Sequence, residues 1–106
     1  MSHRSAAKDV FRAIADPTRR RILDLLSSGE QPVSDLARQF DVTLSAISQH
    51  LGILREVGLI EGRQAGRERL YRLNATALKE VSDWVGHYER FWRERLVALG
   101  EHLEDI

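Results

Sequence analysis

Apolar residues recur every three or four positions along four early stretches of the chain, and this is the period of an amphipathic helix. The stretches lie at residues 5–15, 17–28, 34–40 and 43–58. Polar residues or glycine separate them. The pattern therefore predicts four helices joined by short connections.

Residues that favour a helix start precede three of these stretches. Asp16 stands before Pro17, and a carboxylate followed by proline at the first helical position is typical of a helix start. Ser34 and Thr43 are predicted to cap the third and fourth helices in the same way. Because a tight connection separates these last two helices, they are predicted to form a helix-turn-helix.

The helix at 43–58 has two contrasting faces. Ile47, Leu51 and Leu54 form an apolar side. The other side carries serine and glutamine, whose side chains can hydrogen bond to base edges, and a helix fits the major groove of DNA. We expect this helix to read DNA while the helix before it braces it across the backbone.

After Gly58 the hydrophobic period changes to two. Residues 59–64 and 68–73 read as strands around a turn at Ala65 and Gly66, which predicts a β-hairpin. Residues 59–73 hold four basic and two acidic residues, in a chain whose net charge is zero. Contact of this wing with phosphate and the minor groove is favoured, although exposed arginines can also simply discourage edge pairing.

A last helix is predicted over residues 75–103, capped by Asn74. At about 1.5 Å per residue it would span on the order of 43 Å, more than so small a body can cover. Its apolar stripe is rich in aromatic residues, which concentrate binding energy at interfaces. We expect a homodimer seam, with packing inside the subunit as the alternative for the first half of the helix. The seam residues would be Tyr88, Trp92, Leu96, Leu99 and Leu103.

The composition is that of one soluble globular domain of 106 residues, 42% hydrophobic and 30% charged. Residues 1–4 are expected to be a flexible tail. The absence of cysteine excludes thiol chemistry and thiolate metal sites. There is no apolar run of membrane-spanning length and no charged-then-apolar leader, so we expect a cytoplasmic protein without membrane insertion.

Three consecutive arginines, residues 19–21, fall in the first turn of the second helix. The helix dipole disfavours cations there, so structural need does not explain them well. A solvated basic face and contact with DNA both remain open for them.

Three long segments together carry a resemblance to a known family. They are FRAIADPTRRRILDLL at 11–26, VSDLARQFDVTLSAISQHLGILREVGLI at 33–60 and GRERLYRLN at 66–74. With the tail, they resemble the ArsR/SmtB family of winged helix-turn-helix transcriptional repressors over essentially the entire chain. The resemblance implies a mainly α fold with a small β-hairpin, in which four helices, two strands and a fifth helix follow in order. It also implies a homodimer formed by the first and last helices, to which Val10 and Phe11 would contribute, bound to a two-fold symmetric operator.

The metal ligands of that family's sensors are missing from this sequence. Where the sensors carry paired cysteines, the chain has Pro32 and Ser34, neither of which is a soft-metal ligand. On the last helix Val85 stands where another common site has histidine. We expect no metal and no cofactor. His87 and His102 lie too far apart to share an ion within one chain, and only a partner subunit could complete such a site.

These patterns predict a DNA-binding regulator, most specifically a homodimeric repressor of an inverted-repeat operator. We expect no enzymatic activity, since no nucleophile, base and orienting group occur together. The alternative is a winged helix that serves only protein contacts, which net neutrality keeps open. The inducer, whether a small molecule or a regulatory protein, has no recognisable motif. The predicted DNA contacts are Thr43, Ser45, Ser48, Gln49, His50 and Arg55 on the recognition helix, with Thr43 and His50 reaching phosphate or holding the helix, and Arg63, Gln64, Arg67 and Arg69 on the wing.

Overall fold

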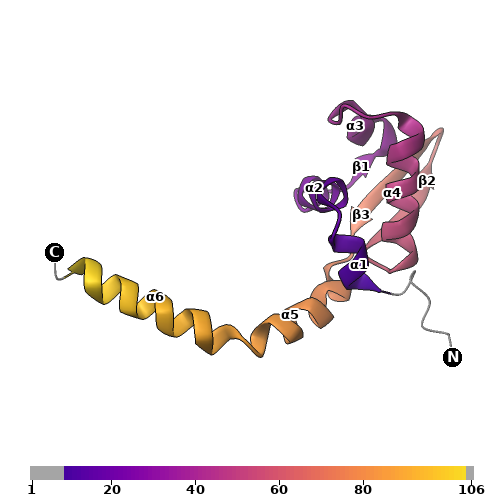
Figure 1. Cartoon of the computed structure of the whole chain (residues 1–106). Coiled ribbons are helices and arrows are strands. Elements are labelled where there is room, and N and C mark those ends of the chain that lie inside the picture. The colour runs from indigo at the N-terminus through magenta and orange to yellow at the C-terminus, as the bar shows by residue number, and fades with distance from the viewer. Residues whose placement is uncertain (1–8, 105–106) are drawn as a thin grey trace, which may run out of the picture.

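The computed structural model describes the backbone of residues 9–104 and the side chains of residues 9–100. Helices and a small sheet form a body, from which the C-terminal helices extend (Figure 1). The helices of the body are α1 (Val10–Ile14), α2 (Pro17–Leu26), α3 (Val33–Arg38) and α4 (Leu44–Glu56). The strands are β1 (Gln31–Pro32), β2 (Ile60–Ala65) and β3 (Glu68–Leu73). A 3-10 turn, η2 (Ala75–Leu78), leads into α5 (Lys79–Gly86) and α6 (Glu89–Glu104).

The sheet has three antiparallel strands in the order β1, β3, β2, whereas the sequence predicted a hairpin of two. In β1, Gln31 pairs with Tyr71 and Pro32 with Leu70. Two residues cannot show an alternating pattern, so only tertiary pairing reveals this strand. The predicted Ser34 cap is wrong for a related reason. Pro32, extended in the sheet, occupies the N-cap position of α3, and no side chain caps that helix.

The hairpin turn consists of Gly66 and Arg67 rather than Ala65 and Gly66. Ala65 still belongs to β2, where it pairs with Glu68. Gly66 has a φ of 64°, and a positive φ at the first central residue alone is typical of a type II′ turn. This turn matches the twist of the strands and places Arg67 at the tip of the hairpin.

A single hydrophobic core lies between the helices of the body and the sheet. The predicted apolar side of α4 is confirmed, since Ile47, Leu51 and Leu54 are each at most 1% exposed. On the sheet, the ring of Tyr71 lies against Gly62, where an added Cβ would come within 2.8 Å of the ring atom Cε1. With its inner side fixed in this core, α4 turns its other side toward solvent.

Asp16, Arg19 and His50 join three of the helices. Asp16 caps α2 as predicted, because its Oδ2 accepts a hydrogen bond from the Arg19 amide at 3.0 Å. The Arg19 guanidinium donates from Nε to the carbonyl oxygen of Ala13 at 2.7 Å and from Nη2 to that of Arg12 at 3.3 Å. Its Nη1 lies 3.2 Å from Nδ1 of His50 on α4. The start of α2 is thereby tied to the end of α1 and to the middle of α4.

The other two arginines of the run at 19–21 also have structural roles that the sequence did not reveal. Arg20 donates from Nη1 to two backbone carbonyl oxygens at the end of α1, at 2.8 and 3.1 Å. Arg21 lies over the ring of Phe40, 4.8 Å from its centroid. The cations that look misplaced in the first turn of α2 therefore stabilise the carboxyl end of α1 and the packing of α2 on the segment after α3.

The helix predicted over residues 75–103 is broken. After Gly86 the chain makes a turn at His87 and Tyr88 before α6 begins. Both turn residues donate their amides to carbonyl oxygens three residues back, at 3.1 and 2.9 Å, instead of four residues back. Glycine is a weak helix former, and a tightened turn beside it bends the helix. The expected single helix is thus replaced by two helices that meet at an angle, and we call α5 and α6 together the arm (Figure 1).

The start of this arm also differs from the prediction. Asn74 makes no side-chain capping bond, and its amide donates to the carbonyl oxygen of Leu59 at 2.8 Å. The chain leaves the sheet through η2 before a regular helix begins. Within residues 9–104, no helix combines the length and the hydropathy needed to cross a membrane.

The cap at Asp16 gives a testable pH dependence. Burial raises the pKa of Asp16, but the bond from the Arg19 amide and the positive charges of His50 and Arg19 outweigh it, and the pKa lies below its usual value. Such a carboxylate stabilises the fold above its unfolded pKa of about 3.9, and the stabilisation is lost as the pH falls through the lower folded pKa. We expect Asp16→Asn, which keeps the cap, to be less stable than the wild type near neutral pH and equally stable below the folded pKa.

Urea unfolding at one fixed protein concentration, from about pH 7 to about pH 2.5, measures this difference. Asp16→Ala is the matched variant that also loses the cap. Near neutral pH it should be less stable than Asp16→Asn by about 1 kcal/mol. A stability gap between the wild type and Asp16→Asn that stays constant across the pH range would show that the charge of Asp16 contributes nothing.

Candidate nucleic-acid interface

The outward side of α4 carries three exposed polar residues in its first two turns. The predicted cap is confirmed, since Oγ1 of Thr43 accepts a hydrogen bond from the Ala46 amide at 3.1 Å. Ser45, Ser48 and Gln49 are exposed. They follow the cap on the side of the helix that faces away from the core, where hydroxyl and amide groups can hydrogen bond to base edges.

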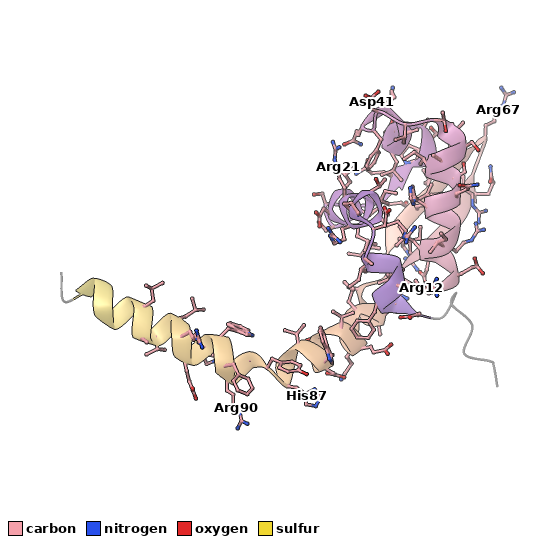
Figure 2. All side chains as sticks on the ribbon, viewed as in Figure 1. Arg12, Arg21, Asp41, Arg67, His87 and Arg90 are labelled. Carbon is pink, nitrogen blue, oxygen red and sulfur yellow. The ribbon has the colours of Figure 1, made fainter. Side chains whose placement is uncertain are left out.

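The start of α4 and the tip of the hairpin lie at the same end of the body. Figure 2 shows Asp41, in the turn before α4, and Arg67, at the hairpin tip, both at the end remote from α5 and α6. In winged helix proteins bound to DNA, the first residues of the recognition helix approach the base edges. A duplex laid along this end would meet that part of α4 and the hairpin tip together.

The four predicted wing residues do not share one face of the sheet. Gln64 and Arg69 are directly paired across the hairpin and lie on the face that also carries Tyr71. The Arg69 guanidinium lies 5.9 Å from the centroid of the Tyr71 ring. Arg67 is exposed at the tip, and Arg63 lies on the opposite face. Strand alternation thus divides residues that looked like one cluster in the sequence.

Arg63 is held in a two-pronged ion pair with Glu30. Its Nε lies 2.9 Å from Oε2 and its Nη2 lies 2.8 Å from Oε1 of the carboxylate. The hydrogen bond from Arg63 lowers the pKa of Glu30, and the same contact raises the pKa of Arg63. Arg72 donates from both Nε and Nη2 to Oε1 of Glu61, at 2.9 and 2.7 Å. These four residues line a shallow cavity of about 290 Å³, and their charges cancel.

His50 holds α4 in place rather than standing free on its outer surface. Its side chain is 22% exposed, and Nδ1 lies 3.2 Å from Nη1 of Arg19 and 3.9 Å from Oδ2 of Asp16. A guanidinium can only donate, so the contact with Arg19 is a hydrogen bond when Nδ1 carries no proton. Arg55 is exposed in the last turn of α4, far along the helix from its cap, where its charge complements the helix dipole.

The predicted seam residues at the start of the chain are already packed. Val10 is only 5% exposed and packs in the core of the body, so it offers little surface to a partner, and its assignment to the seam stays a prediction. Phe11 meets Trp84 edge to face, with ring centroids 5.6 Å apart. The aromatic contacts continue from Trp84 to Tyr88 at 5.6 Å and from Tyr88 to Phe91 at 6.3 Å. The alternative of packing inside the subunit therefore holds in part for α5.

The apolar residues of α6 have no such cover. Trp92, Leu96 and Leu99 are each about half exposed, as is Tyr88 in the turn before α6, and the side chain of Leu103 lies outside the described residues. An open groove of about 480 Å³ follows the bend between the two helices, and Val81, Val85 and Trp92 are among its lining residues. Monomeric proteins rarely expose so continuous an apolar surface.

In the part of the chain that the structure describes, no set of metal ligands surrounds the histidines that were considered as ligands. Among the described residues, no group of three His, Cys, Asp or Glu side chains is placed to hold a metal ion. His87 is exposed in the turn between α5 and α6 (Figure 2). The side chain of His102 lies outside the described residues.

Leu44 was not among the predicted contacts, although it stands out in the structure. It is the first residue of α4 and is 58% exposed. Its spacing from Ile47 and Leu51 places it on the apolar stripe of the helix, so no periodic pattern in the sequence indicates that it is exposed.

Comparisons with known proteins agree with this architecture. The profile of a family described as a helix-turn-helix domain matches residues 14–63. The transcriptional repressor SdpR of Bacillus subtilis is 42% identical over 77 residues, which cover 73% of this chain and 86% of that protein. The HTH-type transcriptional regulator Rv2034 of Mycobacterium tuberculosis is 35% identical over 94 residues, 89% of this chain and 85% of that protein.

A solved structure supports the same assignment. The crystal structure of the ArsR family transcriptional regulator RHA00566 superposes with a TM-score of 0.70 at 35% identity, and covers 78% of this chain and 91% of that one. The predicted fold class, mainly α with a small sheet, and the predicted family are both confirmed. The family is one of DNA-binding transcriptional regulators and not of enzymes. The chain is a member of the ArsR/SmtB family of winged helix-turn-helix transcriptional regulators.

Proposed function

We propose that the chain acts as a homodimeric repressor that binds an inverted-repeat operator in the cytoplasm. The observation that carries this proposal is the placement of two surfaces at opposite ends of the molecule. The polar start of α4 and the hairpin tip lie at one end, and the uncovered apolar arm leaves the other. A dimer joined through the arms would present two recognition helices to one duplex, with half-site centres about 10 to 10.5 base pairs apart or a multiple of that spacing.

The proposed dimer is supported by the exposure of the apolar side chains of α6 within its own subunit. Trp92, Leu96 and Leu99 keep about half of their surface exposed. Burying apolar surface contributes roughly 25 cal/mol per Å², so a second copy that covers this stripe would supply much of the energy of association. Family membership favours this role over a module that makes only protein contacts.

On the DNA, we assign base contacts to Ser45, Ser48 and Gln49. Thr43 and His50 position the helix, since the first caps it and the second is bonded to α2. Arg55 lies too far along α4 to share the base contacts of its first turns and is assigned to phosphate.

From the wing, Arg67 at the tip and the neighbouring pair of Gln64 and Arg69 would reach the backbone or the minor groove. Arg63 would have to give up Glu30 to do the same. Its paired charge is therefore expected to add little to DNA affinity.

The proposed dimer predicts that Leu96→Glu produces a monomer that no longer binds an operator tightly. A carboxylate introduced into an apolar interface costs about 2 kcal/mol or more. Sedimentation velocity and a gel-shift titration of the same samples measure both effects. Val97→Glu is the matched control, since it places the same charge one residue on, about 100° round the helix, at a side chain of similar exposure. A dimeric Leu96→Glu variant would remove α6 from the interface.

For base reading, Gln49→Ala should lose about 1 to 3 kcal/mol of discrimination at one base pair of each half-site. Competition binding between the operator and its single-base variants measures this loss. Binding to random duplexes should change little, because the substitution removes no charge. An unchanged ratio of specific to random binding would show that Gln49 does not touch a base.

For the wing, Arg67→Ala and Arg63→Ala form a matched pair on one hairpin. Losing one phosphate contact should reduce the slope of log affinity against log salt by about 0.9 per subunit. We expect this reduction for Arg67→Ala and a nearly unchanged slope for Arg63→Ala, whose charge Glu30 already neutralises. Equal reductions in the two variants would show that the ion pair opens on DNA.

A further inference from the structure

Large apolar side chains are exposed on the body at the start of its recognition helix. Apart from the C-terminal helices, the exposed large apolar residues in the described part of the chain are Val42 at 47%, Leu44 at 58% and Ile53 at 37%. Val42 and Leu44 flank the capping residue Thr43. Leu44 is as exposed as the apolar residues of the arm, although the core beside it is fully formed.

The position of Leu44 follows from the cap. Because Thr43 caps α4, Leu44 is its first helical residue. Residues four apart are neighbours on a helix surface, so Leu44 adjoins Ser48 one turn further on. Leu51, seven residues on and so about 20° round the helix, lies on the same side as Leu44 and is buried, whereas Leu44 in the first turn is exposed. Leu44 is therefore an apolar side chain exposed in the first turn of α4, beside Ser48 at the edge of the surface assigned to base reading.

We propose that Leu44 reads the 5-methyl group of a thymine in each half-site of the operator, and this rests on the proposed function. The first residues of a recognition helix approach the base edges most closely. Among the groups that bases expose in the major groove, the thymine methyl is the apolar one. Packing Leu44 on that methyl removes both from water. The donors and acceptors of other bases would instead lose water beside Leu44 without gaining a partner.

The location of Leu44 argues against burial in the proposed dimer. The turn before α4 lies at the end of the body remote from the arm, as the place of Asp41 shows (Figure 2). Arg67 lies at that same end. A duplex that meets the hairpin tip would also meet the first turn of α4.

Deoxyuridine substitution tests this contact, because it removes the 5-methyl group and leaves the hydrogen-bonding edge unchanged. Duplexes selected by the wild-type protein from a random pool would carry deoxyuridine at one thymine position at a time, and fluorescence anisotropy would measure affinity. We expect one position per half-site where the wild type loses about threefold to tenfold, the range for one buried methyl group. Leu44→Ala should bind the thymine duplex more weakly and lose less than about twofold on the same replacement.

Two variants serve as controls for Leu44→Ala. Leu44→Met keeps an apolar side chain of similar volume and should keep the response to deoxyuridine. Ile53→Ala truncates another exposed apolar residue of α4, about two and a half turns further on and so on the other side of the helix, and should respond like the wild type. Equal thermal unfolding of all variants confirms that they fold.

The outcomes distinguish this inference from the function on which it rests. If the wild type binds its selected duplex and no thymine position responds to loss of the methyl group, the inference is overturned and operator binding stands. An undiminished response in Leu44→Ala also overturns it, because another group then reads the methyl. If the wild type selects no duplex at all, the proposed function fails and the inference fails with it.

Discussion

Burial of one side of α4 is the constraint on which the rest of the structure depends. Ile47, Leu51 and Leu54 are closed into a core shared with the sheet and the other helices. Such tight packing leaves the helix no freedom to rotate about its axis. Polar contacts of His50 with Arg19 and Asp16 also hold the same helix against the start of α2. The outward side of α4 is therefore presented in one orientation.

Ion pairs, more than the number of charged residues, decide where this protein carries unneutralised charge. The chain has a net charge of zero, and its hairpin segment at 59–73 holds four basic and two acidic residues. There Glu30 and Glu61 neutralise Arg63 and Arg72 on one face, while Arg67 and Arg69 lie at the tip and on the other face. A local positive surface can thus exist at the tip of the hairpin without overall basicity.

The body of this small protein covers only part of the apolar surface of the arm. Packing of Phe11 on Trp84 accounts for part of α5, but the body has no surface near α6. The turn at His87 and Tyr88 changes the direction of the arm and opens the groove at its bend. An exposed apolar surface of this kind typically marks an interaction site.

The sequence by itself determined the features that depend on local interactions. Helical periodicity identified α4 and its buried side, the caps at Asp16 and Thr43 fell where short-range hydrogen bonds require them, and the quoted segments predicted the family. Features that depend on residues far apart in the chain emerge only in the folded structure. β1 exists because Gln31 pairs with Tyr71. Arg63 is neutralised because Glu30 lies across the sheet. The arginines at 19–21 bind the carbonyl oxygens at the end of α1 and pack on the ring of Phe40. The partners in these contacts are set by packing, and no local pattern encodes them.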